Sequence, residues 1–327
     1  MFRWGLLGSG FISSQFAKGI DDIPEAEVYA VASISGNNPY GICAKKYYRN
    51  YEALVKDSKI DAVYVGTIHP QHFPCVKLCL MAGKPVLCEK PIALNSKQLI
   101  ELINLANEKN TFFMEAMWTR YLPAARYIRD ILQKEHYGKV HYMNFTFGNR
   151  ADRSAKRLFD ASLGGGALLD IGVYGLNLAK FWMGEEPNKI HSWAEQDNNT
   201  IDLTTSIQLS YKNGAVADMM FSINKNLPNS AYIVTDKAEF EIPYFWRPNT
   251  VLQYTPNRDF ILERIECKKE FSIVGNGYSY EALEVMHCVK SELLESSDMT
   301  WKDSLCIMRY MDTIRKQCGI KYPQDEE

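Results

Sequence analysis

The chain has 327 residues, enough for two domains of ordinary size, and a globular composition with 46% hydrophobic and 23% charged residues. Lys and Arg number 37 against 39 Asp and Glu, a net charge of −2, so no global field attracts a nucleic acid or an anionic membrane. The eight cysteines lack the spacing of a disulfide framework or a zinc site and indicate reduced thiols. We therefore expect a cytoplasmic protein that acts on a small molecule, with no metal, no nucleic-acid partner and no membrane partner.

The first third of the chain alternates short apolar runs with amphipathic stretches. This is the pattern of successive βαβ units, and it predicts a parallel sheet between helices. The expected strands span residues 2–7, 27–34, 61–67, 85–89 and 111–116, and the expected helices span residues 11–20, 39–48, 51–57, 71–82 and 96–109.

A helix over residues 121–132 precedes longer strands in which apolar and polar residues alternate. Asn213-Gly214 between two of them predicts a hairpin. The fold class we expect is α/β, with an N-terminal Rossmann doubly wound parallel sheet (residues 1–120) and a C-terminal α+β domain built on a large, mostly antiparallel open sheet (residues 121–300). The last helix, 301–318, would be able to pack back on the first domain. The expected strands of this part span residues 140–147, 201–211, 215–223 and 231–242, and its helices span residues 167–183, 278–296 and 301–317.

The segment Gly8-Ser9-Gly10-Phe11-Ile12-Ser13 follows an apolar strand and opens a helix, as the dinucleotide-binding fingerprint requires. Gly8 permits a tight turn, Gly10 lets the backbone approach a pyrophosphate, and the helix N-terminus at Phe11 supplies partial positive charge. Ser13 stands where Gly or Ala is usual and is small enough for close packing. The alternative is an ordinary strand–helix turn, but the βαβ context favours nucleotide binding.

The end of the second strand bears on the choice between NAD and NADP. An NAD site usually places Asp or Glu there to bind the ribose hydroxyls, but no carboxylate lies between positions 27 and 52. Ser33 and Ser35, with Lys45 and Lys46 nearby, could hold a 2′-phosphate instead. A solvated helix face is the alternative for the two lysines. The sequence thus favours NADP(H) over NAD(H).

Two polar groups are candidates for chemistry. Lys90 follows the strand expected over 85–89, where the carboxyl ends of parallel strands line a ligand crevice, and it could exchange a proton with a substrate oxygen. Asp170, Tyr174 and Asn177 share one face of an otherwise apolar helix and suit a polyol or carbonyl. The alternative for Lys90 is an ordinary surface lysine. For Asp170 it is an aspartate favoured by the helix dipole, and for Tyr174 a tyrosine packed in the core.

Four basic residues fall within eight positions just before the glycine run at 164–166. They could form a lip that favours an anionic or heavily hydroxylated substrate. Because two aspartates are interleaved with them, a self-paired, solvated loop is the alternative. The basic residues are Arg150, Arg153, Lys156 and Arg157, and the aspartates are Asp152 and Asp160.

Five motifs stand in the order and spacing of one protein family. They are Gly8-x-Gly10 with Ser13, residues 61–72 (DAVYVGTIHPQH), Glu89-Lys90-Pro91, residues 114–123 (MEAMWTRYLP), and residues 157–160 (RLFD) leading into 164–174. Their combination is more specific than any one of them. The chain resembles the Gfo/Idh/MocA oxidoreductases, particularly the dimeric dihydrodiol dehydrogenase and glucose–fructose oxidoreductase branch, most densely over residues 1 to 187.

The resemblance implies that Lys90 is the catalytic group beside the nicotinamide, with Asp170 and Tyr174 completing the polar site. Many members have His where this chain has Tyr174, so the tyrosine points to the branch named above. It also implies that the loop with His69 and His72 lines the cofactor rather than binding a metal. The implied cofactor-binding residues are Gly8, Ser9, Gly10, Phe11, Ile12, Ser33, Ser35, Thr67, His69, His72, Glu89 and Lys90. The implied substrate-binding residues are Trp118, Arg120, Arg157, Asp170, Tyr174 and Asn177.

These interpretations predict an NADP(H)-dependent dehydrogenase or reductase acting on a secondary alcohol or carbonyl of a sugar, polyol or vicinal diol. Two alternatives remain. One is a redox-neutral enzyme with tightly bound cofactor, and the other is a non-enzymatic NAD(P) sensor on the same scaffold. The open sheet face would pair with a second copy, as in relatives, giving a homodimer or a dimer of dimers.

Overall fold

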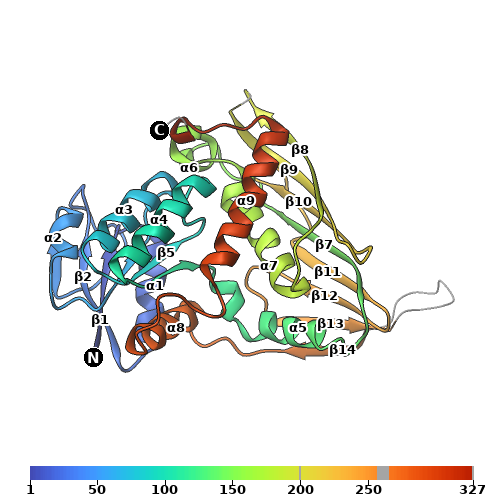
Figure 1. Cartoon of the computed structure of the whole chain (residues 1–327), viewed down its shortest axis with the longest axis horizontal. Coiled ribbons are helices and arrows are strands. Elements are labelled where there is room, and N and C mark those ends of the chain that lie inside the picture. Colours follow the sequence, from blue (N-terminus) through green and yellow to red (C-terminus); the bar gives the residue numbers. More distant parts are fainter. Residues whose placement is uncertain (199, 256–264, 326–327) are drawn as a thin grey trace. The chain divides into compact units, whose positions relative to one another are not determined.

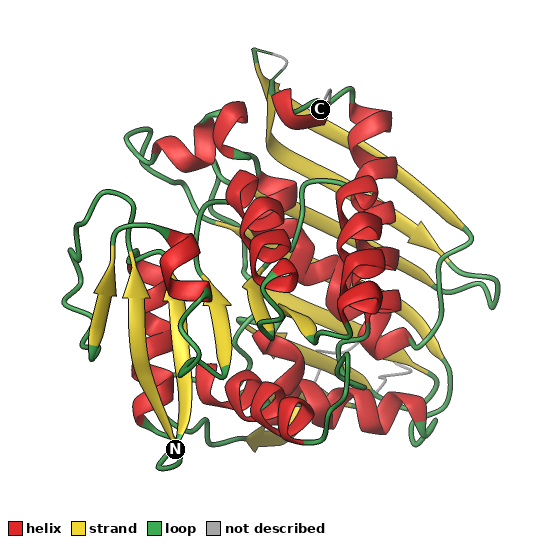
Figure 2. Cartoon of the chain, turned by 60° about the vertical axis from the view of Figure 1, so that its left-hand side comes forward, coloured by secondary structure: helices red, strands yellow, loops and turns green. Residues whose placement is uncertain are grey.

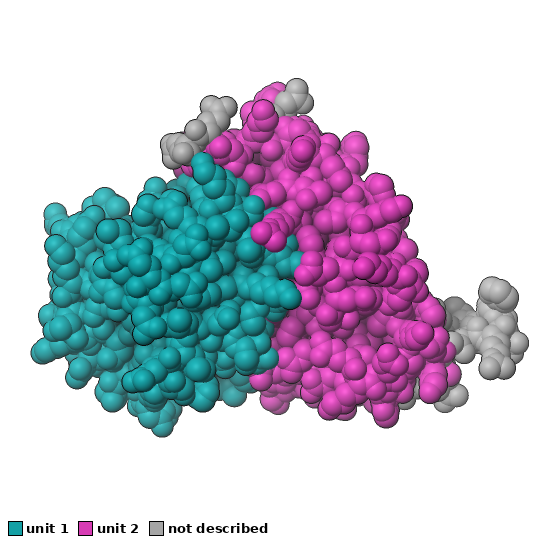
Figure 3. All heavy atoms as spheres, in the orientation of Figure 1, with its two compact units in different colours: residues 1–118, 274–308 teal, residues 119–273, 309–327 magenta. Residues whose placement is uncertain are grey.

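The computed structural model describes residues 1–198, 200–255 and 265–325, and the chain divides into two compact units. Unit 1 comprises residues 1–118 and 274–308, and unit 2 comprises residues 119–273 and 309–327, as coloured in Figure 3. The first division falls close to the boundary expected near residue 120. The second differs from the expectation, because residues 274–300 cluster with unit 1 and the last helix is shared between the units.

The reason for the second difference is a close helix–helix contact inside unit 1. Helix α8 (Tyr278–Lys290) packs against α1 (Phe11–Asp21). At Gly19 of α1, a Cβ atom would lie 2.7 Å from the Cβ of Tyr278, so only glycine permits this approach. A contact between segments some 260 positions apart is not visible in local periodicity.

Unit 1 is built on a six-stranded sheet in the order β3-β2-β1-β4-β5-β6, with every pair parallel (Figure 1). This confirms the Rossmann arrangement predicted from the sequence. The strand order reverses between β1 and β4, and ligands of such sheets bind at the carboxyl ends of those strands. The strands are β1 (Phe2–Leu7), β2 (Ala26–Ala32), β3 (Lys46–Tyr48), β4 (Ala62–Val65), β5 (Val86–Glu89) and β6 (Phe113–Ala116).

Two of the other helices of unit 1, α2 and α4, begin at an asparagine cap. Side chains of Asn50 and Asn95 accept the N–H groups of Ala53 and Gln98, which satisfies orphan donors at two helix starts. The helix predicted over 39–48 is wrong, because that segment is a loop followed by edge strand β3. These helices are α2 (Tyr51–Val55), α3 (His69–Met81) and α4 (Ser96–Lys109).

Unit 2 is built on an eight-stranded sheet in the order β14-β13-β12-β11-β7-β10-β9-β8. Figure 2 shows it as a broad layer of strands, drawn in yellow. Among the described strands of this sheet, only β7 and β10 pair in parallel, which confirms the predicted mostly antiparallel sheet. The segment 231–242 is two strands rather than one, since Thr235 and Ala238 close a turn inside it. The strands are β7 (Val140–Gly148), β8 (Lys189–Asp197), β9 (Ile201–Ser210), β10 (Val216–Ser222), β11 (Ser230–Thr235), β12 (Glu239–Pro243), β13 (Thr250–Tyr254) and β14 (Ile265–Glu270).

One face of this sheet is covered by helices of the same unit, with Phe145, Phe221 and Trp182 in the buried layer. The predicted helix over 167–183 begins as a π-helical turn, η3, before it becomes α7. Among the described helices, none combines the length and apolarity needed to cross a bilayer. The helical elements are η1 (Trp118–Tyr121), α5 (Pro123–Gln133), α6 (Lys156–Phe159), η2 (Ala161–Leu163), η3 (Leu168–Gly172), α7 (Val173–Met183), α9 (Trp301–Cys318) and η4 (Pro323–Asp325).

Candidate active site

The glycine turn after β1 leaves space at the start of α1. Gly8 has a φ of +97°, and a Cβ there would lie 2.8 Å from the carbonyl oxygen of Gly66, whereas a Cβ on Gly10 would have nothing within 4 Å. No side chain caps the N-terminus of α1. The bare N–H groups and the open space beside Gly10 therefore fit a pyrophosphate.

The remaining fingerprint residues support this turn. The Ser13 hydroxyl donates to the Gly66 carbonyl at 3.4 Å, so the small side chain does allow close helix–strand packing. Ser9 donates to the carbonyl of Asn37 at 2.7 Å, which ties the turn to the loop after β2. Phe11 is exposed and lies edge-on to Tyr40, with Ile12 half-buried beside it.

The loop after β2 presents hydroxyls, with Ser33 Oγ 3.2 Å from Ser35 Oγ. The two lysines considered for this place are engaged elsewhere. Lys45 pairs with Glu27 at the start of β2, and Lys46 pairs with Asp57 at 2.6 Å. The hydrogen bond from Lys46 lowers the pKa of Asp57 to about 2. Both lysines are thus bound to carboxylates of their own region rather than to Ser33 or Ser35.

The loop after β4 is held by a buried histidine. His72 Nδ1 lies 2.7 Å from the Pro91 carbonyl oxygen and Nε2 lies 3.1 Å from that of Thr67. Burial lowers the pKa of His72 to about 4, so the ring is neutral at physiological pH and donates one proton, which we assign to the shorter contact. His69 lies edge-on to it at 5.7 Å between ring centroids. His72 thus links the loops after β4 and β5.

Lys90 is half-buried at the end of β5, and its peptide bond to Pro91 is cis. The carboxylate of Glu89 points into the interior, where it accepts a hydrogen bond from Tyr64 at 2.6 Å. Its second oxygen accepts the Lys90 backbone N–H at 3.3 Å. Glu89 therefore fixes the strand end from which Lys90 projects. Trp118, also in unit 1, stacks on Tyr278 with 4.7 Å between ring centroids.

In unit 2, the glycine run leads into the π turn. Gly166 has a φ of +113°, and a Cβ there would lie 2.2 Å from Oδ1 of the buried Asp202. Asp202 Oδ2 accepts the Leu168 N–H at 2.6 Å and the Thr205 hydroxyl. Asp202 thereby anchors the first turn of the helix that carries the candidate polar residues. Sequence reasoning missed it, since it lies 36 residues beyond Gly166 and no motif marks it.

The two candidate residues on that helix have different surroundings. Asp170, with its side chain 15% exposed, pairs with Arg157 at 2.8 Å. The Tyr174 ring lies 6.3 Å from the ring of Phe147, which stacks face to face on Trp246 at 3.7 Å. The helix thus presents two groups. The Asp170 carboxylate is held by Arg157, and the Tyr174 phenol lies beside the stacked rings of Phe147 and Trp246.

Arg120 and Asn177, both predicted to bind substrate, form a hydrogen bond with each other. Arg120 Nε donates to Asn177 Oδ1 at 2.5 Å, and both residues are buried. The guanidinium carbon also lies 4.9 Å from the centre of the Phe181 ring. This pair connects η1 to α7 and fixes which face of α7 carries Tyr174.

Two arginines of the basic loop form ion pairs with aspartates outside it. Arg153 pairs with Asp197 of β8, and Arg157 pairs with Asp170. The interleaved aspartates Asp152 and Asp160 accept backbone N–H groups of the turns that they begin. Arg153 and Arg157 therefore pair with acids outside the loop rather than with the interleaved aspartates.

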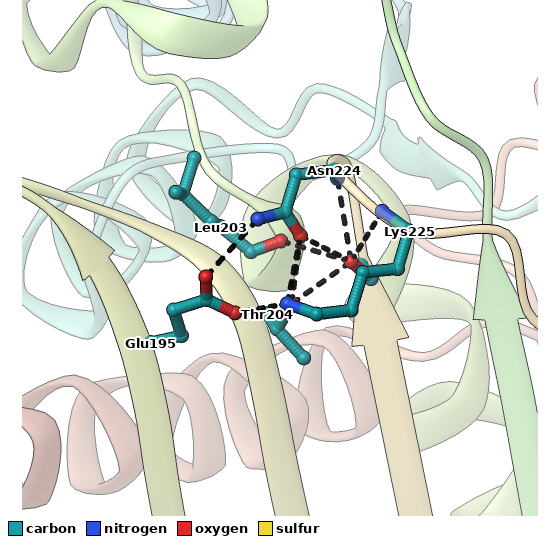
Figure 4. A network of polar contacts seen from close by, with 6 residues as sticks. Glu195, Leu203, Thr204, Asn224 and Lys225 are labelled. Atoms are coloured by element: carbon teal, nitrogen blue, oxygen red, sulfur yellow. Dashed lines mark hydrogen bonds and ion pairs between the residues drawn. The ribbon is translucent and has the colours of Figure 1, made fainter.

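A polar network fixes the loop after β10 (Figure 4). Lys225 reaches Glu195 of β8 and the Thr204 hydroxyl of β9, and Asn224 donates to Glu195 at 3.2 Å. The buried Ser222 hydroxyl bridges Thr204 and Asn224. The network holds the three strand ends in register. Among the described residues, no three His, Cys, Asp or Glu side chains are arranged to hold a metal ion.

Unit 1 has a doubly wound sheet with an open glycine turn where the strand order reverses. Unit 2 carries Asp170 and Tyr174 on a helix that packs on an antiparallel sheet. This combination is typical of a dinucleotide-dependent oxidoreductase. Residues 2–117 match the family described as "Oxidoreductase family, NAD-binding Rossmann fold", and residues 125–241 match the "GFO/IDH/MocA C-terminal domain". The chain belongs to the GFO/IDH/MocA family of oxidoreductases.

Similar proteins extend over the whole chain. The trans-1,2-dihydrobenzene-1,2-diol dehydrogenase of Xenopus laevis is 36% identical over 329 residues, 98% of this chain and 99% of the relative. A 3-ketoreductase from Actinomadura kijaniata, solved with NADP, superposes with a TM-score of 0.85 at 21% identity, covering 97% of this chain and 98% of that one. Levoglucosan dehydrogenase, solved with NADH and levoglucosan, gives a TM-score of 0.84 at 16% identity, covering 97% of each chain.

Proposed function

We propose that the protein is an NADP(H)-dependent dehydrogenase or reductase that acts on a secondary hydroxyl or carbonyl of a vicinal diol, sugar or polyol. The proposal is carried by the arrangement at the start of α7, where Asp170 is fixed by Arg157 and Tyr174 follows beside an aromatic stack. It is supported by the full-length likeness to a relative named as a diol dehydrogenase. The aromatic pair suits the apolar face of a cyclic diol or sugar.

We assign the proton chemistry to three residues of this chain. A bound nicotinamide would supply the acceptor or donor of the hydride that leaves or enters the substrate carbon. Tyr174 and Lys90 hold and move the hydroxyl proton, and Asp170 orients the substrate hydroxyl or Tyr174 itself. The hydrogen-bonded pair Arg120 and Asn177 lies on the same helix face as Tyr174 and remains a candidate substrate contact.

The preference for NADP(H) over NAD(H) rests on the end of β2. The loop there offers the hydroxyls of Ser33 and Ser35 and has no carboxylate to bind the two free hydroxyls of an NAD ribose. A dianionic 2′-phosphate would meet no like charge in this loop. The cofactors in the solved relatives include both NADP and NADH, so the preference is a proposal for this chain.

The proposal is tested by incubating purified protein with NADP⁺ or NAD⁺ and with a trans vicinal diol, an aldose or a polyol, following the absorbance of reduced nicotinamide. The expected result is turnover with NADP⁺ and one of these classes. Binding of both cofactors without turnover of any substrate would contradict it and favour the redox-neutral enzyme or the sensor.

The cooperation of the two catalytic groups is tested by combining K90M and Y174F. If Lys90 and Tyr174 act on the same proton transfer, the double variant loses little more activity than either single variant. Multiplicative losses would contradict a shared step.

We further propose a cytoplasmic homodimer, or a dimer of dimers, paired through the sheet face of unit 2 that its helices leave open. Along β8 alternate residues on this face are exposed, and Trp193 is 63% exposed. Trp193 faces Ser206 of β9, which is also exposed. Covering a large exposed apolar side chain favours association.

A further inference from the structure

The loop after β2, residues 33–38, is built against the glycine turn. Ser9 of that turn donates to the Asn37 carbonyl oxygen at 2.7 Å. Within the loop, Ser35 Oγ accepts the Asn37 N–H at 3.3 Å and lies 3.2 Å from Ser33 Oγ. Two hydroxyls are therefore fixed next to the turn that fits a pyrophosphate, on the side where the adenosine ribose of a dinucleotide lies in such sheets.

An arginine approaches this loop from the neighbouring strand. Strand β3 pairs in parallel with β2, with Tyr48 opposite Ala32, and the Ser33 N–H donates to the Tyr48 carbonyl oxygen at 3.0 Å. Arg49 therefore follows β3 at the level where Ser33 follows β2. A Cβ on Gly36 would lie 3.5 Å from both Cζ and Nε of Arg49. The guanidinium thus lies directly against the turn of the loop.

The neighbouring cations are oriented differently. Lys45 and Lys46 are bound to Glu27 and Asp57, as described above. Arg49 is exposed, and none of the described carboxylates pairs with it. Of these three cations, Arg49 is the one whose charge is directed at the hydroxyl loop.

We infer that Arg49, with the hydroxyls of Ser33 and Ser35, binds the 2′-phosphate of NADP(H). The inference rests on the proposed preference for NADP(H). A guanidinium presents a planar set of donors that matches phosphate oxygens, and the serine hydroxyls add donors to the same group. The phosphate-binding cation is supplied by the strand next to β2 rather than by the β2 loop itself.

The test measures dissociation constants of NADPH and NADH from the fluorescence of the bound nicotinamide, for wild type, R49Q and the control K45Q. We expect R49Q to weaken NADPH binding about 10- to 100-fold, the usual worth of charge-assisted hydrogen bonds, and to leave NADH binding unchanged. K45Q, which removes an equally exposed charge bound to Glu27, should change neither constant. Because Arg49 is exposed, the R49Q variant should retain the wild-type melting temperature.

The possible results separate the inference from the proposal on which it rests. Unchanged NADPH affinity in R49Q, in a protein that prefers NADPH, overturns the role of Arg49 alone. Wild type that binds NADH at least as tightly as NADPH overturns the cofactor preference and the role of Arg49 with it. Equal loss of both cofactors in R49Q also overturns the inference, because the 2′-phosphate would then not be the group contacted.

Discussion

Asp202 offers a quantitative test of how the helix that carries Asp170 and Tyr174 is anchored. It is fully buried on β9, and burial raises its pKa from 3.8 to about 6. The folded protein therefore binds this proton more tightly than the unfolded chain, and stability falls as pH rises between these two values. A shift of about 2 units corresponds to about 3 kcal/mol, so keeping Asp202 ionised costs the fold about 3 kcal/mol above pH 6 and nothing below about pH 4.

The D202N substitution removes the charge and keeps the shape. The amide oxygen can still accept the Leu168 N–H that Asp202 accepts at 2.6 Å. We expect the unfolding free energy of D202N, relative to wild type, to increase by about 3 kcal/mol between about pH 4 and pH 7. Urea unfolding at several pH values measures both proteins, and the difference between them removes the contributions of all other titrating groups.

The control variant D202A separates the charge from the anchor. Both variants lack the titrating carboxyl, but alanine also leaves the Leu168 N–H without its acceptor, so D202A should be less stable than D202N by about 1–3 kcal/mol at every pH. It should also lower kcat, because Asp170 and Tyr174 follow from that turn. A difference between D202N and wild type that does not change with pH, or that falls as pH rises, would refute the reasoning.

Three further predictions follow from single sites. Y174F should lower turnover about 100-fold or more and leave NADPH affinity unchanged, and unaltered turnover would remove Tyr174 from the mechanism. W193E, on the open sheet face, should shift the protein from dimer to monomer in sedimentation velocity, and a persistent dimer would contradict pairing through that face. D57N should destabilise the protein at neutral pH but not near pH 2, because the bond from Lys46 lowers the pKa of Asp57 to about 2. If the loss of unfolding free energy in D57N were larger near pH 2 than at neutral pH, the result would contradict the pairing of Asp57 with Lys46.

The sequence predicted the parts of the fold that local patterns determine. The glycine turn, the strands of unit 1 other than β3 and the Asn213-Gly214 hairpin agree with the structure, because turn chemistry and apolar alternation act over a few residues. The helix predicted over 39–48 failed. There Tyr47 reaches the carbonyl oxygen of Ile42, and the segment ends in edge strand β3.

The sequence motifs indicated the candidate site residues but not the residues that hold or surround them. Lys90, Asp170 and Tyr174 stand in recognisable motifs, whereas Asp202 and Arg49 act through contacts that depend on strand pairing. The ion pairs of Lys45 with Glu27 and of Lys46 with Asp57 were not predicted, because proximity in sequence does not tell which way a side chain leaves an edge strand. The anchoring by Asp202 and the ion pairs of the two lysines both depend on tertiary contacts, which local sequence patterns do not show.

The central claim is that this protein moves a hydride between the carbon of a secondary alcohol and a nicotinamide. The most direct measurement uses a trans vicinal diol deuterated at its carbinol carbons, incubated with NADP⁺ and enzyme, with mass analysis of the nicotinamide product. The account predicts one deuterium in the reduced cofactor and a matching amount of oxidised diol. Deuterium that stays in the substrate, or that is lost to water without net cofactor reduction, would contradict it.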